Sequence, residues 1–559
     1  MENQRKKRIL FCTEATYLNT GYATYSREIL NYLHSTGKYE IAELGAYSSS
    51  DDPRAKNIPW KFFGVIPNKN SSKENLAKYQ SCGVGQFGGF NFESICITFM
   101  PDIVCDIRDF WMLNFAHNSP FRRLFKWAIM PTVDAAPQES QWIDVYRQSD
   151  ACFTYSDWAG DVIKKQTNGK INYLGSAPPS AHESYKIIED KDALKKSFDL
   201  NPNWEIIGTV MRNQRRKLYP DLFEAFRMFL DKVDNPMKYK LYCHTSYPDA
   251  GWDIPELLHE YNVRSSVLFT YVCKTTGMPF ASTFTGPQCI SPFTRQKTGH
   301  LPNVKDGISY DDMAKVMNIF DLYVQYANCE GFGLPQVEAA ACGIPVMGTD
   351  YSAMESVLRQ LDGIPIKPKA LYKELETGCF RAVPDNKLAA DLFFDFFAKP
   401  KSVRKKMGFT CFQNFKEKFR WDISGKQWED YFDSVKIVNG ESGLWKSPLN
   451  ILEPAPKPDN DFIRQSSPLD LSSWLIMNVL REPSQLGTYK HHEITQSLIY
   501  GVRHMKQIGS YLNEEGSIVS SQNRAEYKPF DFNQAYDMLC QMRSHRNNWE
   551  KIRAGELIR

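Results

Sequence analysis

Two glutamates separated by seven residues stand in the most informative stretch of the chain, residues 329–351, CEGFGLPQVEAAACGIPVMGTDY. Glu330 lies in a glycine-rich loop, and Glu338 lies one turn inside the helix that we expect to begin near Pro335. The loop amides and the positive end of that helix suit an anion. Because the carboxylates flank these amides, the stretch suits a sugar diphosphate, with Glu330 on sugar hydroxyls and Glu338 on both ribose hydroxyls. Neither role requires a metal.

A basic loop supplies cations for such a ligand. Residues 210–219 have the sequence VMRNQRRKLY and place Arg212 and Lys217 five positions apart. A departing nucleoside diphosphate gains negative charge as its bond to the sugar breaks, so two fixed cations can take the place of a metal. We interpret Arg215 and Arg216 as solvent-facing, because runs of charge usually face water.

With its flanking residues, the segment around Glu330 and Glu338 resembles the signature of the GT-B glycosyltransferases, specifically the retaining group known as family 4 or glycosyltransferase group 1. The resemblance implies a second domain that holds a nucleotide sugar and a first domain that holds a hydroxyl acceptor. It also implies transfer with retention at the anomeric carbon and no cofactor beyond the nucleotide sugar. The implied nucleotide-sugar site consists of Gly21, Arg212, Lys217, Glu330, Gly331, Phe332, Gly333, Leu334 and Glu338.

The resemblance makes Glu330 and Asp134 the candidate catalytic residues. Asp134 lies in PTVDAAP, residues 131–137, where many members of the group carry a histidine that this chain lacks. Asp134 either contacts the reacting sugar or the acceptor, or caps the following helix. In this family the departing phosphate oxygen is thought to help deprotonate the acceptor, which fits the absent histidine. Arg108 and Asp109 follow a predicted strand and either line the cleft or form a buried salt pair.

The elements that position these residues are predicted from short apolar runs that alternate with helical patterns, as in parallel β/α units. Strands are expected at 8–12, 39–44, 103–105, 127–130 and 151–155, and again at 205–210, 240–243, 267–271, 322–325 and 344–347. Helices are expected at 23–33, 221–233 and 425–435, the last closing the second half.

The predicted fold class is therefore α/β, of GT-B type, with two Rossmann-like doubly wound domains facing a cleft and a C-terminal helical appendage. We place the acceptor domain at 1–200, the nucleotide-sugar domain at 201–444, and a proline-rich linker with the appendage at 445–559. Closure of the cleft would protect the donor from water, so residues 201–203 and the helix after Trp421 are expected to move.

The appendage shows helical patterns at 471–480, 494–508 and 532–549 but no catalytic motif. Its role, like the oligomeric state, is not indicated by any residue pattern. His491 and His492 are interpreted as a surface pair at a helix start.

The stretch 273–301 is rich in Thr, Gly and Pro and is predicted to be an irregular insertion. Cys273 and Cys289 each begin a zinc-ribbon spacing, but Thr276 and Pro292 replace the second cysteines. Two thiols cannot close a tetrahedral site, even though His300 could add a third ligand. We expect no metal there.

Composition limits the classes of partner. The 559 residues carry 68 Lys plus Arg and 65 Asp plus Glu, a formal charge of +3, which gives no overall attraction to nucleic acid or membrane. The 13 cysteines are predicted to be buried free thiols. No apolar run has the length of a membrane span or signal peptide, so a cytoplasmic location is expected.

Three other functions remain open at this point. A phage-type glycosyltransferase acting on modified DNA bases would use a basic, stacking surface formed by Arg5 to Arg8, Phe110, Trp111, Arg122, Arg123, Phe125, Lys126 and Trp127. A GT-B-fold scaffold protein would bind partners without turnover, and an epimerase would need no acceptor. The donor nucleotide, the sugar and the acceptor are not specified by any motif.

Overall fold

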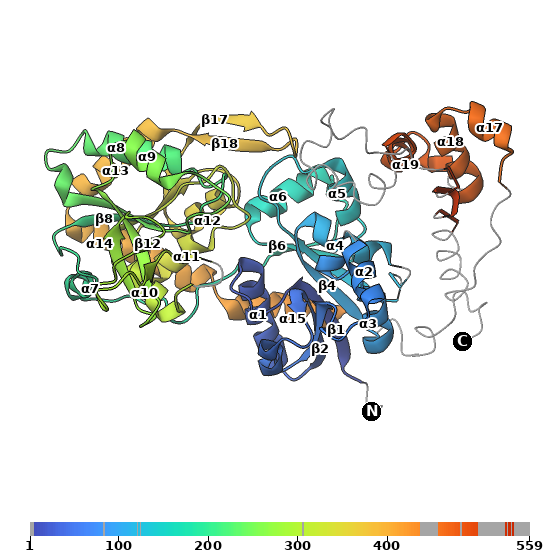
Figure 1. The fold of residues 1–559 in the computed structure, drawn as a ribbon, viewed down its shortest axis with the longest axis horizontal. Helices are drawn as coiled ribbons and strands as arrows, with labels where there is room; N and C mark the ends of the chain where they lie inside the picture. Colours follow the sequence, from blue (N-terminus) through green and yellow to red (C-terminus); the bar gives the residue numbers. More distant parts are fainter. Residues whose placement is uncertain are drawn as a thin grey trace.

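The computed structural model describes residues 5–81, 84–119, 121–122, 124–303, 307–436, 457–480, 483–500, 532–533, 535–537 and 539–540. Two α/β halves lie side by side, and a group of C-terminal helices stands apart from them (Figure 1). The predicted α/β class is therefore confirmed.

The sheet of the first half has the strand order β3-β2-β1-β4-β5-β6-β7, and its pairs are parallel. Its strands are β1 (Lys7–Glu14), β2 (Tyr39–Ser49), β3 (Lys61–Ile66), β4 (Ile103–Arg108), β5 (Lys126–Pro131), β6 (Ala151–Thr154) and β7 (Tyr173–Ser176). Its helical segments are α1 (Gly21–Ser35), η1 (Pro53–Asn57), α2 (Lys73–Ser81), η2 (Gly85–Phe87), α3 (Phe92–Phe99), α4 (Phe110–Asn118), α5 (Ser140–Tyr146) and α6 (Asp157–Gln166). Helices cover both faces, so the central strands are continuous apolar runs.

The sheet of the second half has the order β12-β13-β10-β9-β8-β14-β15-β16, with β11 paired to β10. Its strands are β8 (Glu205–Val210), β9 (Tyr239–His244), β10 (Val267–Cys273), β11 (Pro279–Thr283), β12 (Gln288–Cys289), β13 (Gly299–His300), β14 (Leu322–Gln325), β15 (Val346–Thr349) and β16 (Ile364–Ile366). Its helical segments are α7 (Lys191–Ser197), α8 (Tyr219–Leu230), η3 (Pro236–Lys238), α9 (Ile254–Glu260), α10 (Tyr310–Asn318), α11 (Leu334–Ala341), α12 (Ala353–Leu361), α13 (Asn386–Ala398) and α14 (Lys401–Lys418).

Two segments of the second half differ from expectation. The stretch 273–301 is not irregular throughout, because β11, β12 and β13 in it form antiparallel pairs at the edge of the sheet. A separate antiparallel hairpin, β17 (Pro368–Lys373) and β18 (Phe380–Pro384), extends from the second half toward the first (Figure 1). Neither set of short, partly exposed strands has a continuous apolar run that would reveal it.

The helix α15 (Trp421–Ser434) returns the chain to the first half, where Figure 1 shows it beside α1 and β1. Trp428 Nε1 donates a hydrogen bond of 3.0 Å to the Tyr25 hydroxyl of α1, and the Trp428 ring lies 6.0 Å from that of Phe11 in β1. The expectation that this helix closes the second half is therefore wrong: its apolar face packs on the first.

The forward crossing lies earlier than expected. Lys195 in α7 pairs with Asp321 beside β14 at 2.9 Å, so α7 is already bound to the second half. Residues 201–203, which follow α7, thus lie inside that half, and the chain crosses at 177–190. The division into domains and its boundaries stay predictions.

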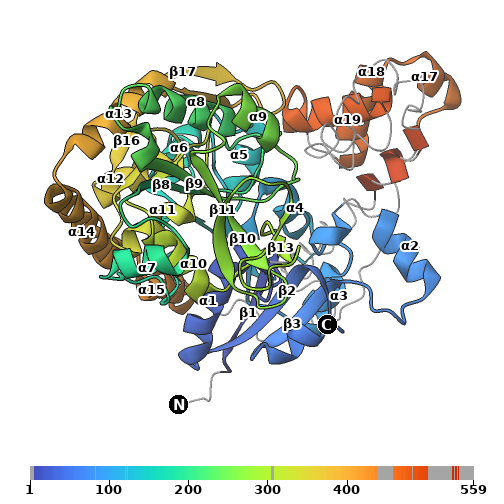
Figure 2. The ribbon, with the colours of Figure 1, turned by 60° about the vertical axis from the view of Figure 1, so that its left-hand side comes forward.

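The C-terminal helical segments, which Figure 2 shows away from both sheets, are α17 (Asn460–Gln465), α18 (Pro468–Trp474), η4 (Leu475–Leu480), η5 (Pro483–Gln485) and α19 (Tyr489–Tyr500). Leu475, Ile476 and Leu498 belong to a small apolar core of their own. The pattern at 471–480 is helical as predicted. Residues 448–456, 501–508 and 541–549, on which parts of the linker and appendage predictions fall, lie outside the described residues.

The described cysteines are free thiols, and all of them except Cys540 are buried, as predicted. No helix in the described part of the chain is long and apolar enough to cross a membrane.

Candidate functional site

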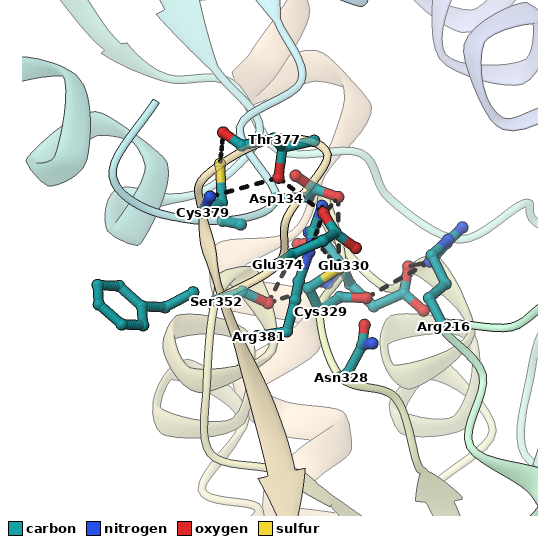
Figure 3. A network of polar contacts seen from close by, with 12 residues as sticks. Asp134, Arg216, Asn328, Cys329, Glu330, Ser352, Glu374, Thr377, Cys379 and Arg381 are labelled. Atoms are coloured by element: carbon teal, nitrogen blue, oxygen red, sulfur yellow. Dashed lines mark hydrogen bonds and ion pairs between the residues drawn. The ribbon is translucent and has the colours of Figure 1, made fainter. Parts of the chain in front are cut away.

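Glu330 lies in the loop between β14 and α11, where the structure gathers polar side chains from both halves (Figure 3). Its side chain is buried and accepts contacts from three donors. Lys217 Nζ and Gln325 Nε2 approach Oε1, the latter at 2.9 Å, and Arg216 Nη1 approaches Oε2 at 2.5 Å. The Glu330 amide donates to Ser352 Oγ at 2.9 Å. Glu330 is thus fixed both at its backbone amide and at its carboxylate.

The glycines around Glu330 are required by their surroundings. A Cβ at Gly331 would lie 2.5 Å from the Thr132 methyl group of the first half, so the loop can approach β5 this closely only without a side chain. Gly333 has φ +87°, which favours glycine, and it forms the N-cap of α11 without a side-chain cap. The N-terminus of α11 therefore lies beside Glu330 without a capping side chain, although Pro335 has no amide hydrogen and the Gln336 amide already donates to the Gly333 carbonyl at 3.0 Å.

Phe332 and Leu334, the other residues of the predicted loop, have a packing role in this structure. Phe332 is buried, and its ring lies 6.1 Å from that of Phe419. Leu334 is the first residue of α11 and packs against the same apolar cluster. Both side chains anchor the loop, while its backbone remains the part that can meet a ligand.

Glu338 lies in α11 one turn after the loop, as the sequence predicts. Burial raises the pKa of its carboxyl group to about 7, and a hydrogen bond from the Tyr185 hydroxyl acts in the opposite direction. Tyr185, itself buried, lies in the segment that crosses between the halves. No sequence pattern indicates Tyr185, because it belongs to no motif.

The basic loop contributes different cations from those expected. Lys217 is buried against Glu330; burial lowers the pKa of its ammonium group well below the usual range, and the neighbouring Arg216 guanidinium lowers it further. Arg212 instead forms a two-pronged ion pair with Asp249, at 2.7 and 2.9 Å. The Arg216 side chain is 40% exposed, so it faces solvent in part as interpreted, but its guanidinium also contacts Glu330. The loop is held in place because the Asn328 amide donates to the Arg216 carbonyl at 2.9 Å.

Asp134 lies in the loop after β5, on the first-half side of the same network (Figure 3). Its Oδ2 accepts from Arg381 Nη1 at 3.0 Å and from Cys329 Sγ at 3.3 Å. The alternative that Asp134 caps the following helix is wrong, because Glu139 is the N-cap of α5. Asp134 therefore faces the residue that precedes Glu330.

Arg381 was not predicted from the sequence. It lies on β18 and is buried, and its guanidinium also donates to Glu374 Oε2 at 2.8 and 3.1 Å. It reaches the site only because the hairpin carries it there: the Phe380 amide donates to the Ala136 carbonyl of the first half at 2.8 Å. The halves are thus joined by backbone and side-chain bonds beside Glu330.

Gly21 is the first residue of α1, and a side chain there would meet no atom within 4 Å. The next residue, Tyr22, donates to Asp109 Oδ1 at 2.7 Å and also contacts Thr132 Oγ1. Burial raises the pKa of Asp109 to about 6, and the nearby Asp134 and Glu14 add to the effect. Asp109 thus shares a hydrogen-bonding partner with Thr132, and the alternative that it lines the cleft stays a prediction.

Arg108 forms a buried salt pair, but its partner is Asp106 on the same strand. Both side chains are fully buried. Arg108 therefore belongs to the core of the first half, and the two residues that the sequence treats together have separate roles.

The described aromatic part of the surface expected for a DNA acceptor is interior, whereas its described basic residues are exposed or partly exposed. The aromatic residues of that set whose side chains are described are buried: Phe110, Phe125 and Trp127. Arg122 and Lys126 both pair with Asp150, at 3.0 and 2.8 Å. Little of the set is left to stack on bases.

No group of three or more His, Cys, Asp or Glu side chains in the described ranges is arranged to hold a metal ion. Cys273 is buried with its Sγ 3.5 Å from Thr298 Oγ1. The expectation that no metal binds stays a prediction.

Comparisons with known proteins agree with this geometry. A family model described as "Glycosyl transferases group 1" matches residues 303–392, the stretch that holds Glu330, Glu338 and Arg381. Sucrose synthase from Solanum tuberosum is 28% identical over 162 residues, which cover 28% of this chain and only 17% of that protein. The resemblance to group 1 glycosyltransferases is thereby confirmed within the matched stretch.

Solved structures share the overall fold. Sucrose-phosphate synthase from Thermosynechococcus elongatus has a TM-score of 0.57 at 14% identity, covering 77% of this chain and 98% of that one. A glycosyltransferase from Rickettsia africae has a TM-score of 0.54 at 12% identity, covering 78% and 100%. Anabaena HepE, solved with UDP and glucose, has a TM-score of 0.52 at 12% identity, covering 77% and 100%. The predicted GT-B architecture is confirmed.

Proposed function

We propose that the chain is a retaining, metal-independent glycosyltransferase that moves a sugar from a nucleoside-diphosphate sugar to a hydroxyl acceptor. The observation that carries this proposal is the position of Glu330, which lies against two cations at the start of α11 and beside the first half. Support comes from the family match over the same residues and from the shared fold of HepE, whose structure contains UDP and glucose.

The donor diphosphate would lie at the N-terminus of α11. The N-terminus of α11 has no side-chain cap, and the positive end of the helix favours negative charge. Lys217 and Arg216 would exchange part of their contact with Glu330 for the phosphate oxygens, and Arg212 would have to leave Asp249 to join them. These cations would stabilise the charge that gathers on the leaving group.

Glu330, released in part from its cations, would accept hydrogen bonds from sugar hydroxyls, and Glu338 from the ribose. The bond between C1 and the phosphate oxygen would break with its electron pair staying on the phosphate. The acceptor oxygen would bond to C1 on the same face, and its proton would pass to the departing phosphate oxygen. Because the departing phosphate oxygen takes the proton, no protein base is needed. Asp134 would orient the reacting groups through its position beside Cys329.

A binding screen tests the donor assignment. Thermal unfolding should be measured with UDP, GDP, ADP, CDP and their common sugars in the presence of EDTA. We expect one nucleotide to stabilise the protein by about 2.7 kcal/mol at about 100 times its dissociation constant. Lys217→Met should abolish this shift, whereas Lys315→Met, which alters a half-exposed lysine on α10, should not. A protein that no nucleotide stabilises would contradict the proposal.

Product analysis tests the chemistry. Glu330→Gln keeps the shape of the side chain and should reduce transfer about 100-fold or more while the nucleotide still binds. The anomeric configuration of the product, read by NMR, should equal that of the donor. Inversion would overturn the retaining assignment, and activity restored only by an added divalent ion would overturn metal independence. A product formed without an acceptor would identify an epimerase.

A further inference from the structure

Four strands of the first sheet end at one place with polar residues. Glu14 ends β1, Asp109 follows β4, Thr132 follows β5 and Tyr155 follows β6. The strand order places β1 next to β4, so the direction in which the sheet is built changes between them. In open parallel α/β sheets, ligands bind outside the carboxyl ends of the strands at such a switch point.

The two carboxylates at this point are largely buried. Glu14 is 7% exposed and accepts a hydrogen bond from the Thr20 hydroxyl, and Asp109 accepts one from Tyr22 at 2.7 Å. Each carboxylate offers about four acceptor positions, more than these hydroxyls occupy. Arg108, which lies within electrostatic range of Glu14, is bound to Asp106. The switch point is therefore rich in acceptors and negative in charge.

The Tyr155 hydroxyl provides an independent observation. Tyr155 is 6% exposed, and its ring packs edge-on against Tyr25 at 5.2 Å. Its hydroxyl is buried and has no hydrogen-bond partner among the described residues. The same hydroxyl lies within electrostatic range of Asp109, Glu14 and Tyr22. A buried polar group without a partner calls for an explanation, and a bound ligand at the switch point supplies one.

We infer that Glu14, Asp109 and Tyr155 form the acceptor subsite and that the acceptor is a neutral polyhydroxylated molecule, a sugar or a related polyol. Vicinal hydroxyls match two carboxylates that need donors and a phenol that can donate or accept. The subsite lies beside the donor sugar, because Thr132 separates Asp109 from Gly331, the neighbour of Glu330. The assignment as an acceptor subsite rests on the proposed function.

Charge separates this acceptor class from others. A phosphorylated or carboxylated acceptor would place a second negative group beside Glu14 and Asp109, and like charges at close range repel strongly where water is excluded. A DNA acceptor would bring its phosphates to the same place. The subsite should therefore prefer a neutral polyol over its own phosphate ester.

The test is an NMR titration of the whole protein. D-glucose, D-fructose and myo-inositol should each be compared with their monophosphates, with and without UDP. We expect at least one neutral polyol to bind, and its monophosphate to bind at least about tenfold more weakly. Tighter binding of the monophosphate, or no binding of any neutral polyol, would overturn the inference.

Single substitutions test whether the polyol binds at this subsite. Asp109→Asn and Tyr155→Phe should each weaken polyol binding at least about tenfold. Because Asp109→Asn removes a negative charge, it should also reduce the ratio of polyol affinity to monophosphate affinity. Tyr155→Phe should leave the melting temperature of the free protein unchanged or higher, since the lost hydroxyl had no partner to stabilise. Asp161→Asn, an exposed carboxylate on α6, is the matched control. Unchanged polyol binding in both variants would refute the subsite.

UDP binding distinguishes failure of the acceptor subsite from failure of the proposed glycosyltransferase function. If UDP binds but no polyol does, the acceptor inference fails and the donor site stands. If a polyol binds through Asp109 while no nucleotide binds at all, the subsite stands and the glycosyltransferase assignment fails.

Discussion

Two carboxylates of the candidate site occupy opposite environments only eight residues apart in the sequence. Glu330 lies against Lys217 and Arg216, which favour its charged form. Glu338 lies inside α11, where burial raises its pKa to about 7 against the hydrogen bond from Tyr185. Environments that separate two such groups indicate different tasks. The cations beside Glu330 can pass to a bound anion, and Glu338 can accept hydrogen bonds from hydroxyl groups that would stabilise its charged form.

The environment of Glu338 predicts a pH-dependent cost in stability. Between its unfolded pKa of about 4.5 and its folded pKa of about 7, the folded protein binds more protons at this group, so the free energy of unfolding falls as pH rises. The full cost, about 3 kcal/mol, is reached above about pH 7. Glu338→Gln should therefore match the wild type near pH 5 and be more stable by about 2 to 3 kcal/mol near pH 8.

Urea unfolding at the two pH values measures this difference. Glu256→Gln, which alters an exposed carboxylate at the start of α9, should show the same difference from wild type at both. Equal effects of Glu338→Gln near pH 5 and pH 8 would contradict the raised pKa of Glu338.

At the residue scale, the sequence predicts which residue types form the site better than it predicts which of them contact each other. Glu330 and Lys217 lie together because the loops that carry them follow adjacent parallel strands, β14 and β8. Arg212 and Arg216 are equally basic and four positions apart, and only the turn of the loop decides that one meets Asp249 and the other Glu330. That choice depends on Asp249, which follows a different strand, so local sequence cannot reveal it.

At the scale of elements, the hairpin β17–β18 is held to the first half by few bonds. The connection is made by the Ala136–Phe380 backbone pair, the Asp134–Arg381 ion pair and a hydrogen bond of 2.9 Å from Cys379 Sγ to the Pro137 carbonyl, while Leu371 and Tyr372 on the hairpin are exposed. A segment with so little buried apolar surface should open locally at low cost. Arg381 is thus expected to set its stability.

Removing Arg381 should release the hairpin. Arg381→Gln leaves Asp134 and Glu374 without their shared cation, so amide exchange over residues 368–384 should accelerate at least tenfold, which corresponds to about 1.4 kcal/mol. Arg359→Gln should not change exchange there, because Arg359 is exposed on α12 and pairs with Glu355. If exchange of the hairpin is the same in both variants, Arg381 does not secure it.

The same physics explains which elements could be predicted. Strands such as β8 and β14 are buried on both faces, so apolar runs mark them and their bounds agree with expectation. The strand β17 is mostly exposed and carries Lys369 and Lys373, so its composition resembles a loop. The hairpin that brings Arg381 to the site is therefore the part of the site that sequence patterns miss.

At the scale of the whole molecule, the two chain crossings decide which parts can separate. The segment 177–190 leads into α7, which is bound to the second half, and the return runs through Phe419 and Arg420 from α14 into α15. α14 lies against the second half, where a Cβ on its Gly408 would clash with the Gly343 carbonyl. α15 packs on α1 through Trp428 and Tyr25. Opening should therefore bend the chain at 177–190 and at 419–420.

A cross-link between the halves tests whether opening is needed for exchange of the nucleotide. Ala136 and Phe380 face each other in an antiparallel bridge, which places their Cα atoms within the range that a disulfide spans. Under oxidation, Ala136→Cys with Phe380→Cys should slow release of a bound nucleotide about tenfold or more, and reduction should restore it. Cys379, whose Sγ lies 2.9 Å from the Pro137 carbonyl oxygen, should be replaced by Ser in every protein compared, so that it cannot pair with the new thiols. The Ala136→Cys single variant, treated alike, controls for oxidation. The disulfide would join the halves at one edge, and the crossings at 177–190 and 419–420 join them elsewhere. Equal release rates in the oxidised and reduced forms would therefore mean that the nucleotide leaves without separation of the halves.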